Sequence, residues 1–132
     1  MQEYNIEDRL EIYRSACRKG TDWLLNFMNA DGSNNRQVTA NGASNFAPYF
    51  YSDGKRIIFS SNLAGPVADK GRPSFQLFLV NDDGTGSEQI TFNGHFNSFP
   101  MFSHDGGKLV WVSDRDAEAR GEFNVFIADW VP

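Results

Sequence analysis

The chain has 132 residues, and 40% of them are hydrophobic, with twelve Phe, three Trp and four Tyr. This length and aromatic content are enough to build one β-domain with a packed core. The formal net charge of −5 and the lack of any basic run argue against nucleic acid or an anionic membrane surface as a partner. No apolar stretch is long enough for membrane insertion as a helix, and the single Cys17 excludes an internal disulfide.

Residues 1–23 are expected to form an N-terminal helical segment. Asn5 is a suitable N-cap, and Arg18 and Lys19 would lie in the last turn before Gly20. The alternative is that residues 10–14, LEIYR, form a strand left over from an earlier repeat. The capping residues favour a helix over 6–19, whose apolar face would hold Ile6, Leu10, Tyr13 and Cys17.

An internal repeat with a spacing of 52 residues dominates the rest of the chain. PYFYSDGKRIIFSSN at 48–62 matches PMFSHDGGKLVWVSD at 100–114. LNFMNADGSNNRQVT at 25–39 matches LFLVNDDGTGSEQIT at 77–91 with the same spacing. Two separate pairs with one offset indicate a duplicated structural unit.

Each unit is predicted to be a meander of four antiparallel strands. Asp53-Gly54 and Asp105-Gly106 lie between apolar runs and predict tight hairpins of type I′, in which both central residues have φ > 0. Stacking such four-stranded sheets around an axis gives a β-propeller. A solenoid of β-arches is the alternative, but the Asp-Gly hairpins favour up-and-down meanders.

Propeller-type blades are expected over 24–132. A half blade at 24–39 would supply a third and a fourth strand. The full blade at 46–91 would have strands at 48–51, 56–60, 75–81 and 87–91, and a three-stranded blade at 99–129 would have strands at 99–103, 108–113 and 123–129. The predicted fold class is therefore all-β, with about two four-stranded antiparallel blades of β-propeller type and a short N-terminal helix.

The segments NADGSNNRQVT, FAPYFYSDGKRIIFSSN, NDDGTGSEQITF and SFPMFSHDGGKLVWVSDR resemble the repeats of TolB-like (WD40-like) β-propellers, the six-bladed periplasmic domain of the Tol–Pal system and its relatives. The resemblance covers about 24–132 and implies a C-terminal fragment of about two blades. It also implies a non-catalytic protein–protein interaction scaffold in the bacterial periplasm, without a cofactor. The chain departs from the family at Ser52 and His104, where Pro usually precedes Asp-Gly.

Two other functions remain open. The same repeats occur in the propellers of prolyl-oligopeptidase-type and tricorn-type serine peptidases, so the chain could be part of such a propeller domain whose catalytic domain is absent. A truncated gene product without a role of its own is the third possibility. The segment MQEYNIEDRL lacks the basic and apolar regions of a signal peptide, which leaves a cytoplasmic location or a fragment open beside the periplasm.

The sequence contains no recognisable catalytic or metal-binding motif, and we expect that the chain is not an enzyme. His95 and His104 are the histidines of the sequence, and His104 is expected in a solvated hairpin turn. No G-x-S-x-G motif is present, and the serines at strand ends, Ser60, Ser61 and Ser113, have no evident His–Asp pair. The loops at 29–34 and 81–86 lack the alternate-position ligands of a calcium loop, so no metal or other cofactor is expected.

Two connections carry the candidate partner-binding residues, because loops on a rigid scaffold are the usual place for recognition. One is the connection between the two blades at 93–98, and the other is the long loop at 63–74. The candidate residues are His95, Phe96, Asn97, Pro66 and Arg72.

Phe96 is expected to be the exposed aromatic residue of these connections, because the equivalent position in the first repeat is Ser44. Phe46 and Phe99 are expected to fill the space between blades instead.

Strand counting predicts self-association. The blade at 99–129 lacks a fourth strand, so the strand at 35–39 of a neighbouring chain could complete it, and head-to-tail contacts of this kind close into rings. Three chains of two blades would give the six blades of the family, so we expect a homo-oligomer that is a trimer or, alternatively, a dimer. A helix over 6–19 that caps one open face would instead keep the chain monomeric.

Overall fold

The computed structural model describes residues 18–19, 22–23, 25–65 and 74–131. Within these ranges the chain forms eleven β-strands and no helix. The strands belong to antiparallel sheets of two, two, four and three strands. The all-β fold class expected from the sequence is confirmed.

The two larger sheets correspond to the internal repeat. The predicted strands are present, with small shifts at their ends. In the four-stranded sheet the order is β5 (Asn45–Phe50), β6 (Arg56–Ser61), β7 (Gln76–Asn81) and β8 (Glu88–Gln89). In the three-stranded sheet the order is β11 (Asn124–Asp129), β10 (Lys108–Ser113) and β9 (Asn97–Phe102).

Two short strand pairs precede these sheets. β3 (Asn26–Phe27) pairs with β4 (Arg36–Gln37), as expected for the third and fourth strands of a half blade. β1 (Arg18–Lys19) pairs with β2 (Asp22–Trp23).

The β1–β2 pair corrects the expected N-terminal helix. Arg18 and Lys19, which would lie in the last turn of such a helix, instead pair with Trp23 and Asp22. Backbone groups engaged in such a cross-strand ladder are not available for the bonds of a helix. The other positions of the expected helix, 6–17, lie outside the described residues.

The Asp-Gly hairpins have a different turn type from the predicted one. The Gly54 N–H donates to the Tyr51 carbonyl (2.9 Å), so Tyr51–Gly54 is the turn and Gly54, with φ of +68°, is its last residue. Asp53 is not among the residues with positive φ, whereas type I′ requires positive φ at both central positions. The tight reversal with glycine at positive φ is confirmed, and the type I′ assignment is wrong. The same bond closes the turns Ser103–Gly106, Asn81–Gly84 and Asn29–Gly32.

The aspartates of these turns act through their side chains. Asp53 Oδ1 accepts from the Lys55 N–H (2.8 Å), and Asp105 Oδ1 accepts from the Gly107 N–H (2.9 Å) and the Ser103 hydroxyl (2.6 Å). A carboxylate that bonds the backbone two residues on stabilises the reversal without positive φ at the aspartate.

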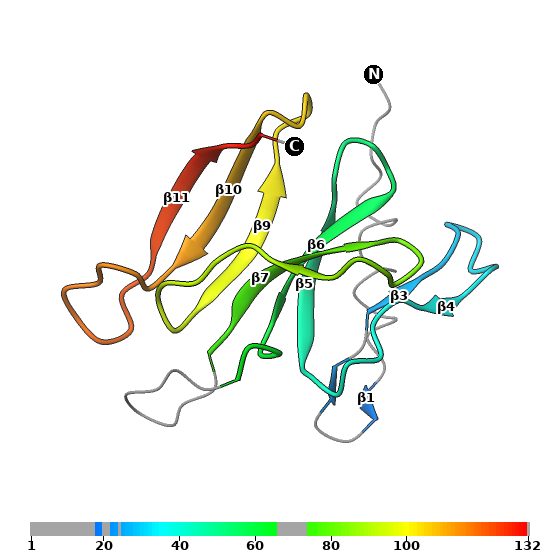
Figure 1. The fold of residues 1–132 in the computed structure, drawn as a ribbon, viewed down its shortest axis with the longest axis horizontal. Coiled ribbons are helices and arrows are strands. Elements are labelled where there is room, and N and C mark those ends of the chain that lie inside the picture. Colours follow the sequence, from blue (N-terminus) through cyan, green and yellow to red (C-terminus); the bar gives the residue numbers. More distant parts are fainter. Residues whose placement is uncertain (1–17, 20–21, 24, 66–73, 132) are drawn as a thin grey trace.

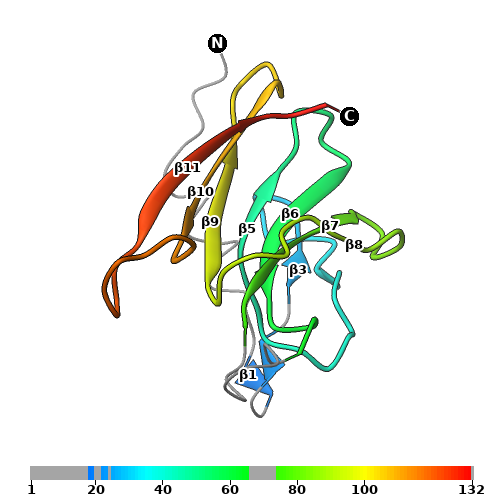
Figure 2. The same cartoon turned by 60° about the vertical axis from the view of Figure 1, so that its left-hand side comes forward.

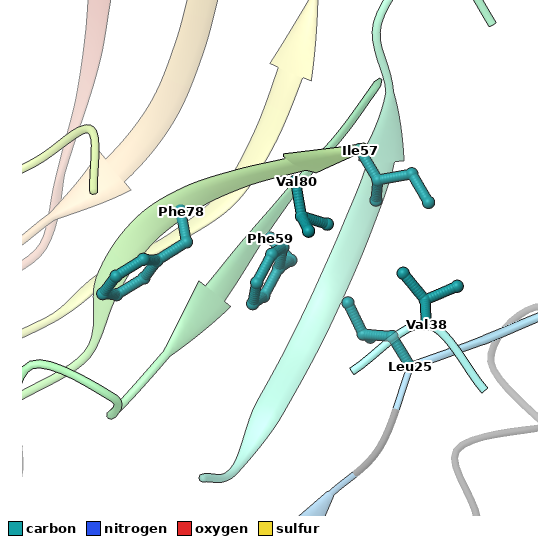
Figure 3. Close-up of a cluster of buried hydrophobic side chains, with 6 residues drawn as sticks. All are labelled: Leu25, Val38, Ile57, Phe59, Phe78 and Val80. Carbon is teal, nitrogen blue, oxygen red and sulfur yellow. The ribbon is translucent and has the colours of Figure 1, made fainter. Parts of the chain in front are cut away.

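The full blade packs against the half blade through one apolar face. Phe59 of β6 and Phe78 of β7 stack with ring centroids 6.1 Å apart and 29° between the planes. The buried cluster consists of Leu25 and Val38 from the half blade with Ile57, Phe59, Phe78 and Val80 (Figure 3).

The second interface between sheets repeats the first. On the opposite face of β6 and β7, Ile58, Leu77 and Leu79 pack against the three-stranded sheet. Trp111, 52 residues after Phe59, stacks on Phe126 with centroids 5.7 Å apart and 28° between the planes. The other partners from this sheet are Phe102 and Leu109, which lie 52 residues after Phe50 and Ile57 of the first cluster.

The sheets therefore lie side by side, each covering the next. Figures 1 and 2 show the four-stranded sheet (green) in the middle, the three-stranded sheet (yellow to red) on one side and β3–β4 (cyan to blue) on the other. This arrangement explains why the central strands are apolar on both faces.

We predict that Gly106→Val destabilises the protein more than Gly54→Val. Both glycines have positive φ (+73° and +68°), so valine at either costs roughly 1 kcal/mol or more. A Cβ at Gly106 would also overlap the Ser52 hydroxyl and lie 3.0 Å from the Tyr51 hydroxyl, whereas a Cβ at Gly54 would meet no atom within 4 Å. Urea midpoints of the two variants measure the difference, and equal midpoints would contradict this packing of one hairpin on the other.

We predict that Asp105→Asn makes the protein less sensitive to acid. The hydrogen bonds from the Ser103 hydroxyl and the Gly107 N–H hold the pKa of Asp105 below its ordinary value. A lowered folded-state pKa means that the carboxylate stabilises the fold above the unfolded pKa of about 3.9, and that this stability is lost as the pH falls through the folded pKa. Asparagine keeps the Oδ1 acceptor without the charge, so the urea midpoint of the variant should fall less between pH 7 and acid. A parallel fall in both proteins would refute the role of the charge.

Candidate functional site

Asn97 lies at the centre of a buried hydrogen-bond network at one end of the three-stranded sheet. Its side chain is fully buried, and Nδ2 donates to Gln76 Oε1 (3.0 Å) and to the Asn93 carbonyl (2.9 Å). Oδ1 accepts from the Trp111 indole N–H (3.3 Å) and from the Arg115 guanidinium (3.2 Å). One side chain thus connects β9 to β7, to β10 and to the two loops beside it.

Asn45, the equivalent residue of the first repeat, has the same role. Its side chain is also fully buried, and Nδ2 donates to the Ala43 carbonyl (2.9 Å) and to Asn41 Oδ1 (3.0 Å). Oδ1 accepts from the Ser61 hydroxyl (2.7 Å). The network is therefore a feature of the repeat, and it fixes where the connections 41–45 and 93–97 lie.

A neighbouring threonine completes each network. The Thr91 hydroxyl accepts from the Leu77 N–H (2.8 Å), and the Thr39 hydroxyl accepts from the Leu25 N–H (2.9 Å). Each threonine takes the place of a ladder carbonyl at the end of a short outer strand. The outer strands are thereby tied to the blades although few backbone bonds hold them.

The serines at the strand ends are buried and form hydrogen bonds within the blades. Ser60, Ser61 and Ser113 are fully buried. The Ser60 hydroxyl donates to the Asn97 carbonyl (2.7 Å), and the Ser113 hydroxyl accepts from the Arg115 N–H (3.1 Å). Buried hydroxyls with these partners are poor candidates for a nucleophile, which must be accessible to substrate.

The connection that carries Asn97 also presents an aromatic cluster at this end of the molecule. Phe46 and Phe75 are in edge contact (5.2 Å between centroids), and Phe96 contacts Phe123 (5.3 Å). Phe99 contacts Phe46 (6.2 Å). We refer to these five residues, Phe46, Phe75, Phe96, Phe99 and Phe123, as the aromatic cluster.

A shallow pocket of about 350 Å³ opens within the aromatic cluster. Its lining consists of Ser44, Phe46, Phe75 and Phe96. The small Ser44 leaves the space that its counterpart Phe96 would fill. The apolar walls of the pocket suit an apolar side chain of a partner.

The predicted partner-binding residues do not all lie on one surface in the structure. Phe96 lines the pocket, and the His95 side chain is partly exposed next to it, with Nδ1 3.9 Å from Asp114 Oδ2. Asn97 is buried and cannot contact a partner, which corrects its assignment. Pro66 and Arg72 lie outside the described residues.

The expected exposure of the aromatic residues is corrected as well. Phe96 is only partly exposed because its ring packs between Phe75 and Phe123, whereas Phe99 is 51% exposed. Phe99 has positive φ (+52°) at an irregularity between β9 and β10, which turns its side chain outward. Phe123, 52% exposed, belongs to this aromatic surface too. Its place there depends on tertiary packing, so the sequence contains no signal for it.

A larger groove of about 590 Å³ is lined by β5 and β9, the first strands of the two sheets, and by the half blade at 25–28 and Val38. Its walls carry Tyr49 and Tyr51 from β5 and the following turn, and Met101 from β9. His104, an exposed residue of the β9–β10 turn as expected, lies at its edge. The sequence contained no separate signal for this groove, because it forms only where the half blade and the two larger sheets come together.

Neither a metal site nor a membrane span is found in the described part of the chain. No group of three His, Cys, Asp or Glu residues there could hold a metal ion. Asp31 and Asp83 of the loops compared with calcium loops bond their own turns, at Ser33 and Thr85. No helix among these residues has the length and apolarity to cross a bilayer.

No protein-family model matches the chain. A TolB-like protein from Agrobacterium tumefaciens is similar in structure over 81% of this chain and 37% of its own, with 27% identity and a TM-score of 0.66. TolB from Acinetobacter baumannii is similar over 86% of this chain and 26% of its own, with 22% identity and a TM-score of 0.62. The second likeness supports the fold alone.

A curated protein is similar in sequence. Dipeptidyl-peptidase 5 from Porphyromonas endodontalis is 31% identical over 91 residues, which are 68% of this chain and 12% of the peptidase. The chain thus spans only a minor part of each of these relatives. The likenesses agree with the repeat pattern of the sequence and with the stacked sheets.

We predict that Asn97→Leu destabilises the protein by about 2 kcal/mol or more, because the Trp111 indole and the Arg115 guanidinium lose a buried acceptor. The control is Asn124→Leu on β11, where the side chain is exposed and the change should stay within roughly 0.5 kcal/mol. Urea unfolding measures both. Similar small effects at the two sites would show that the network contributes little.

Proposed function

We propose that this chain, which is built from TolB-like β-propeller blades, is a non-catalytic protein–protein interaction scaffold. The pocket of the aromatic cluster carries this proposal. It is apolar, it lies on a connection whose backbone is fixed by Asn97, and exposed Phe99 and Phe123 flank it. Aromatic residues around a small pocket are the usual anchors of protein interfaces.

The rigidity of this surface favours binding. The N–H groups of His95 and Phe96 both donate to Asp114 Oδ1 (2.8 and 2.9 Å), and the Phe75 N–H donates to the His95 carbonyl (2.9 Å). A pocket whose walls are already ordered loses little conformational entropy when a partner binds.

A partner side chain would enter between Phe46, Phe75 and Phe96, and His95 with Asp114 would form the polar rim. The partner is therefore a protein with an exposed apolar anchor. Resemblance to the TolB-like family supports a location in the periplasm. The three strands of the sheet β11-β10-β9, one fewer than in the four-stranded sheet, support self-association of the chain, as a trimer or a dimer, as a further part of the proposal.

A second function is favoured by the likeness to dipeptidyl-peptidase 5. In this alternative the chain is part of the propeller domain of a serine peptidase, and catalysis resides outside it. The coding sequence that flanks this chain discriminates the two: an adjoining α/β-hydrolase supports the peptidase, and its lack supports the scaffold.

We predict that Ser44→Phe abolishes partner binding and leaves the fold intact. Phenylalanine at this position should fill the pocket, and the second repeat already accommodates Phe96 there with the same backbone bond, from the N–H to Asn62 Oδ1 in one repeat and to Asp114 Oδ1 in the other. The wild-type chain would be used to capture a partner from extract of the source cell, and the affinity of the identified partner would then be measured.

Ser87→Phe is the matched control, because it adds the same ring at an exposed position just before β8 of the four-stranded sheet. We expect a loss of affinity of at least tenfold for Ser44→Phe and none for Ser87→Phe. Equal affinities of all three proteins would refute the pocket as the binding site.

We also predict that the purified chain does not hydrolyse peptide or ester substrates, since the serines at the strand ends are buried in the blade networks. Assays with chromogenic peptides and esters test this. Hydrolysis that disappears on replacement of one serine by alanine, with the fold retained, would contradict the scaffold.

A further inference from the structure

The sequence contains six pairs in which Asp or Asn directly precedes Gly. They are Asp31-Gly32, Asn41-Gly42, Asp53-Gly54, Asp83-Gly84, Asn93-Gly94 and Asp105-Gly106. The backbone nitrogen of such a glycine can attack the carbonyl carbon of the preceding side chain, because glycine has no Cβ that hinders the approach. Groups held in stable hydrogen bonds react only after local opening of the structure. The hydrogen bonds at the six pairs therefore decide which of them reacts in the folded protein.

Both reacting groups are held in the four Asp-Gly pairs. Each glycine N–H closes its turn, as the Gly54 N–H does with the Tyr51 carbonyl (2.9 Å) and the Gly106 N–H with the Ser103 carbonyl (2.9 Å). Each carboxylate accepts a hydrogen bond from the backbone N–H two residues on. An ionised carboxylate is also a poor electrophile. We therefore expect these four pairs to be stable.

The side chain is held in the first of the two Asn-Gly pairs. Asn41 Oδ1 accepts from the Ala43 N–H (3.1 Å) and from Asn45 Nδ2 (3.0 Å), and Asn41 Nδ2 lies 3.2 Å from Asn45 Oδ1. The Asn41 amide is thus a member of the buried network around Asn45, and its carbonyl carbon is not free to turn towards Gly42.

Asn93, the equivalent residue of the second repeat, is placed differently. Here Asn97 Nδ2 bonds the backbone carbonyl of Asn93 (2.9 Å) and takes Gln76 Oε1 as its other partner (3.0 Å). The Asn93 side chain is exposed, and neither it nor the Gly94 N–H forms a hydrogen bond with another residue in the described part of the chain. Both reacting groups are therefore available at this pair.

Packing around position 94 requires the glycine that makes Asn93 reactive. Gly94 has φ of +83°, and a Cβ there would lie 2.8 Å from Asp114 Oδ1 and 3.1 Å from the Ser113 hydroxyl. Any larger residue would be strained and would collide with the carboxylate that bonds the N–H groups of His95 and Phe96. A reactive pair is thus built into the connection between the two blades.

We propose that Asn93 is a site of spontaneous deamidation in the folded protein. The Gly94 nitrogen gives its proton to solvent and bonds to Asn93 Cγ, the Cγ–Nδ2 bond breaks, and ammonia leaves. Water then opens the resulting succinimide at one of its two carbonyls. The product is an aspartate or an isoaspartate, in which the main chain runs through the former side chain and is one carbon longer. This inference does not depend on the proposed partner pocket.

The isoaspartate product alters the network of Asn97. The carbonyl that accepts from Asn97 Nδ2 is then no longer part of the main chain leading to Gly94, and the connection that carries Phe96 is longer. A buried donor that loses a well-placed acceptor destabilises the fold. We therefore expect the isoaspartate form to unfold at a lower urea concentration than the unmodified chain.

The test is incubation of the folded chain in mildly alkaline water enriched in ¹⁸O, followed by peptide mapping. Opening of a succinimide places one ¹⁸O atom in the product, so the label reports all six pairs, the aspartates included. Asn93 should acquire the label roughly tenfold or more faster than Asn41 and than each of the four aspartates. Equal labelling of Asn93 and Asn41, or no labelling of Asn93, would overturn the proposal.

The unfolded chain is the reference, because it removes the structural difference between the two pairs. In guanidinium chloride Asn41 and Asn93 should acquire the label at similar rates, and Asn41 should react much faster than in the folded protein. If Asn93 kept its full advantage in the unfolded chain, local sequence and not the fold would explain it, and the proposal would fail. Asn93→Gln should fold normally and lose the labelling at this position.

Isoaspartate is distinguished from aspartate by enzymatic methylation, to which only the isoaspartate form responds. The isoaspartate fraction of the aged chain should have a lower urea midpoint than the fresh chain, and Asn93→Asp, which adds the charge without the extra carbon, should keep the midpoint of the fresh chain. Equal midpoints of the isoaspartate fraction and the fresh chain would overturn the predicted effect on Asn97.

Discussion

The buried side-chain amide of Asn97, and that of Asn45 one repeat earlier, is the interaction on which the rest of the structure depends. Each amide receives and donates hydrogen bonds in a region that excludes water, where an unpaired polar group is costly. Its partners come from neighbouring strands and from the connection that enters the blade. The network therefore fixes the position of each connection, and the aromatic cluster with its pocket is held on one of them.

The second constraint is that the central strands are apolar on both faces, so each sheet must be covered twice. Phe59 with Phe78 and Trp111 with Phe126 stack in nearly the same geometry in two successive interfaces. The three-stranded sheet uses one face in this way and leaves Val125 and Ile127 exposed on the other. Stability of the blades thus follows from this packing rule.

Much of this fold could be predicted from the sequence, because the repeat and its apolar runs indicate the positions of the strands. The turn type could not, since the carboxylates of Asp53 and Asp105 stabilise a different reversal from the one that Asp-Gly usually indicates. The burial of Asn97 and the outward turn of Phe99 depend on contacts between strands distant in sequence. The β1–β2 pair was missed because helix caps and a short strand pair use the same polar residues. Phe96, a candidate because of its mismatch with Ser44, lines the pocket together with that serine, and its role in binding stays a prediction.

Native-state hydrogen exchange at two sites tests the central claim most directly. The Leu77 N–H donates to the Thr91 hydroxyl, and the Trp111 indole N–H donates to Asn97 Oδ1, both inside the network. If the networks hold the blades together, both protons exchange only through global unfolding, with the free energy that urea unfolding gives. Exchange of either proton at the rate of an exposed loop such as 115–122 would contradict the account.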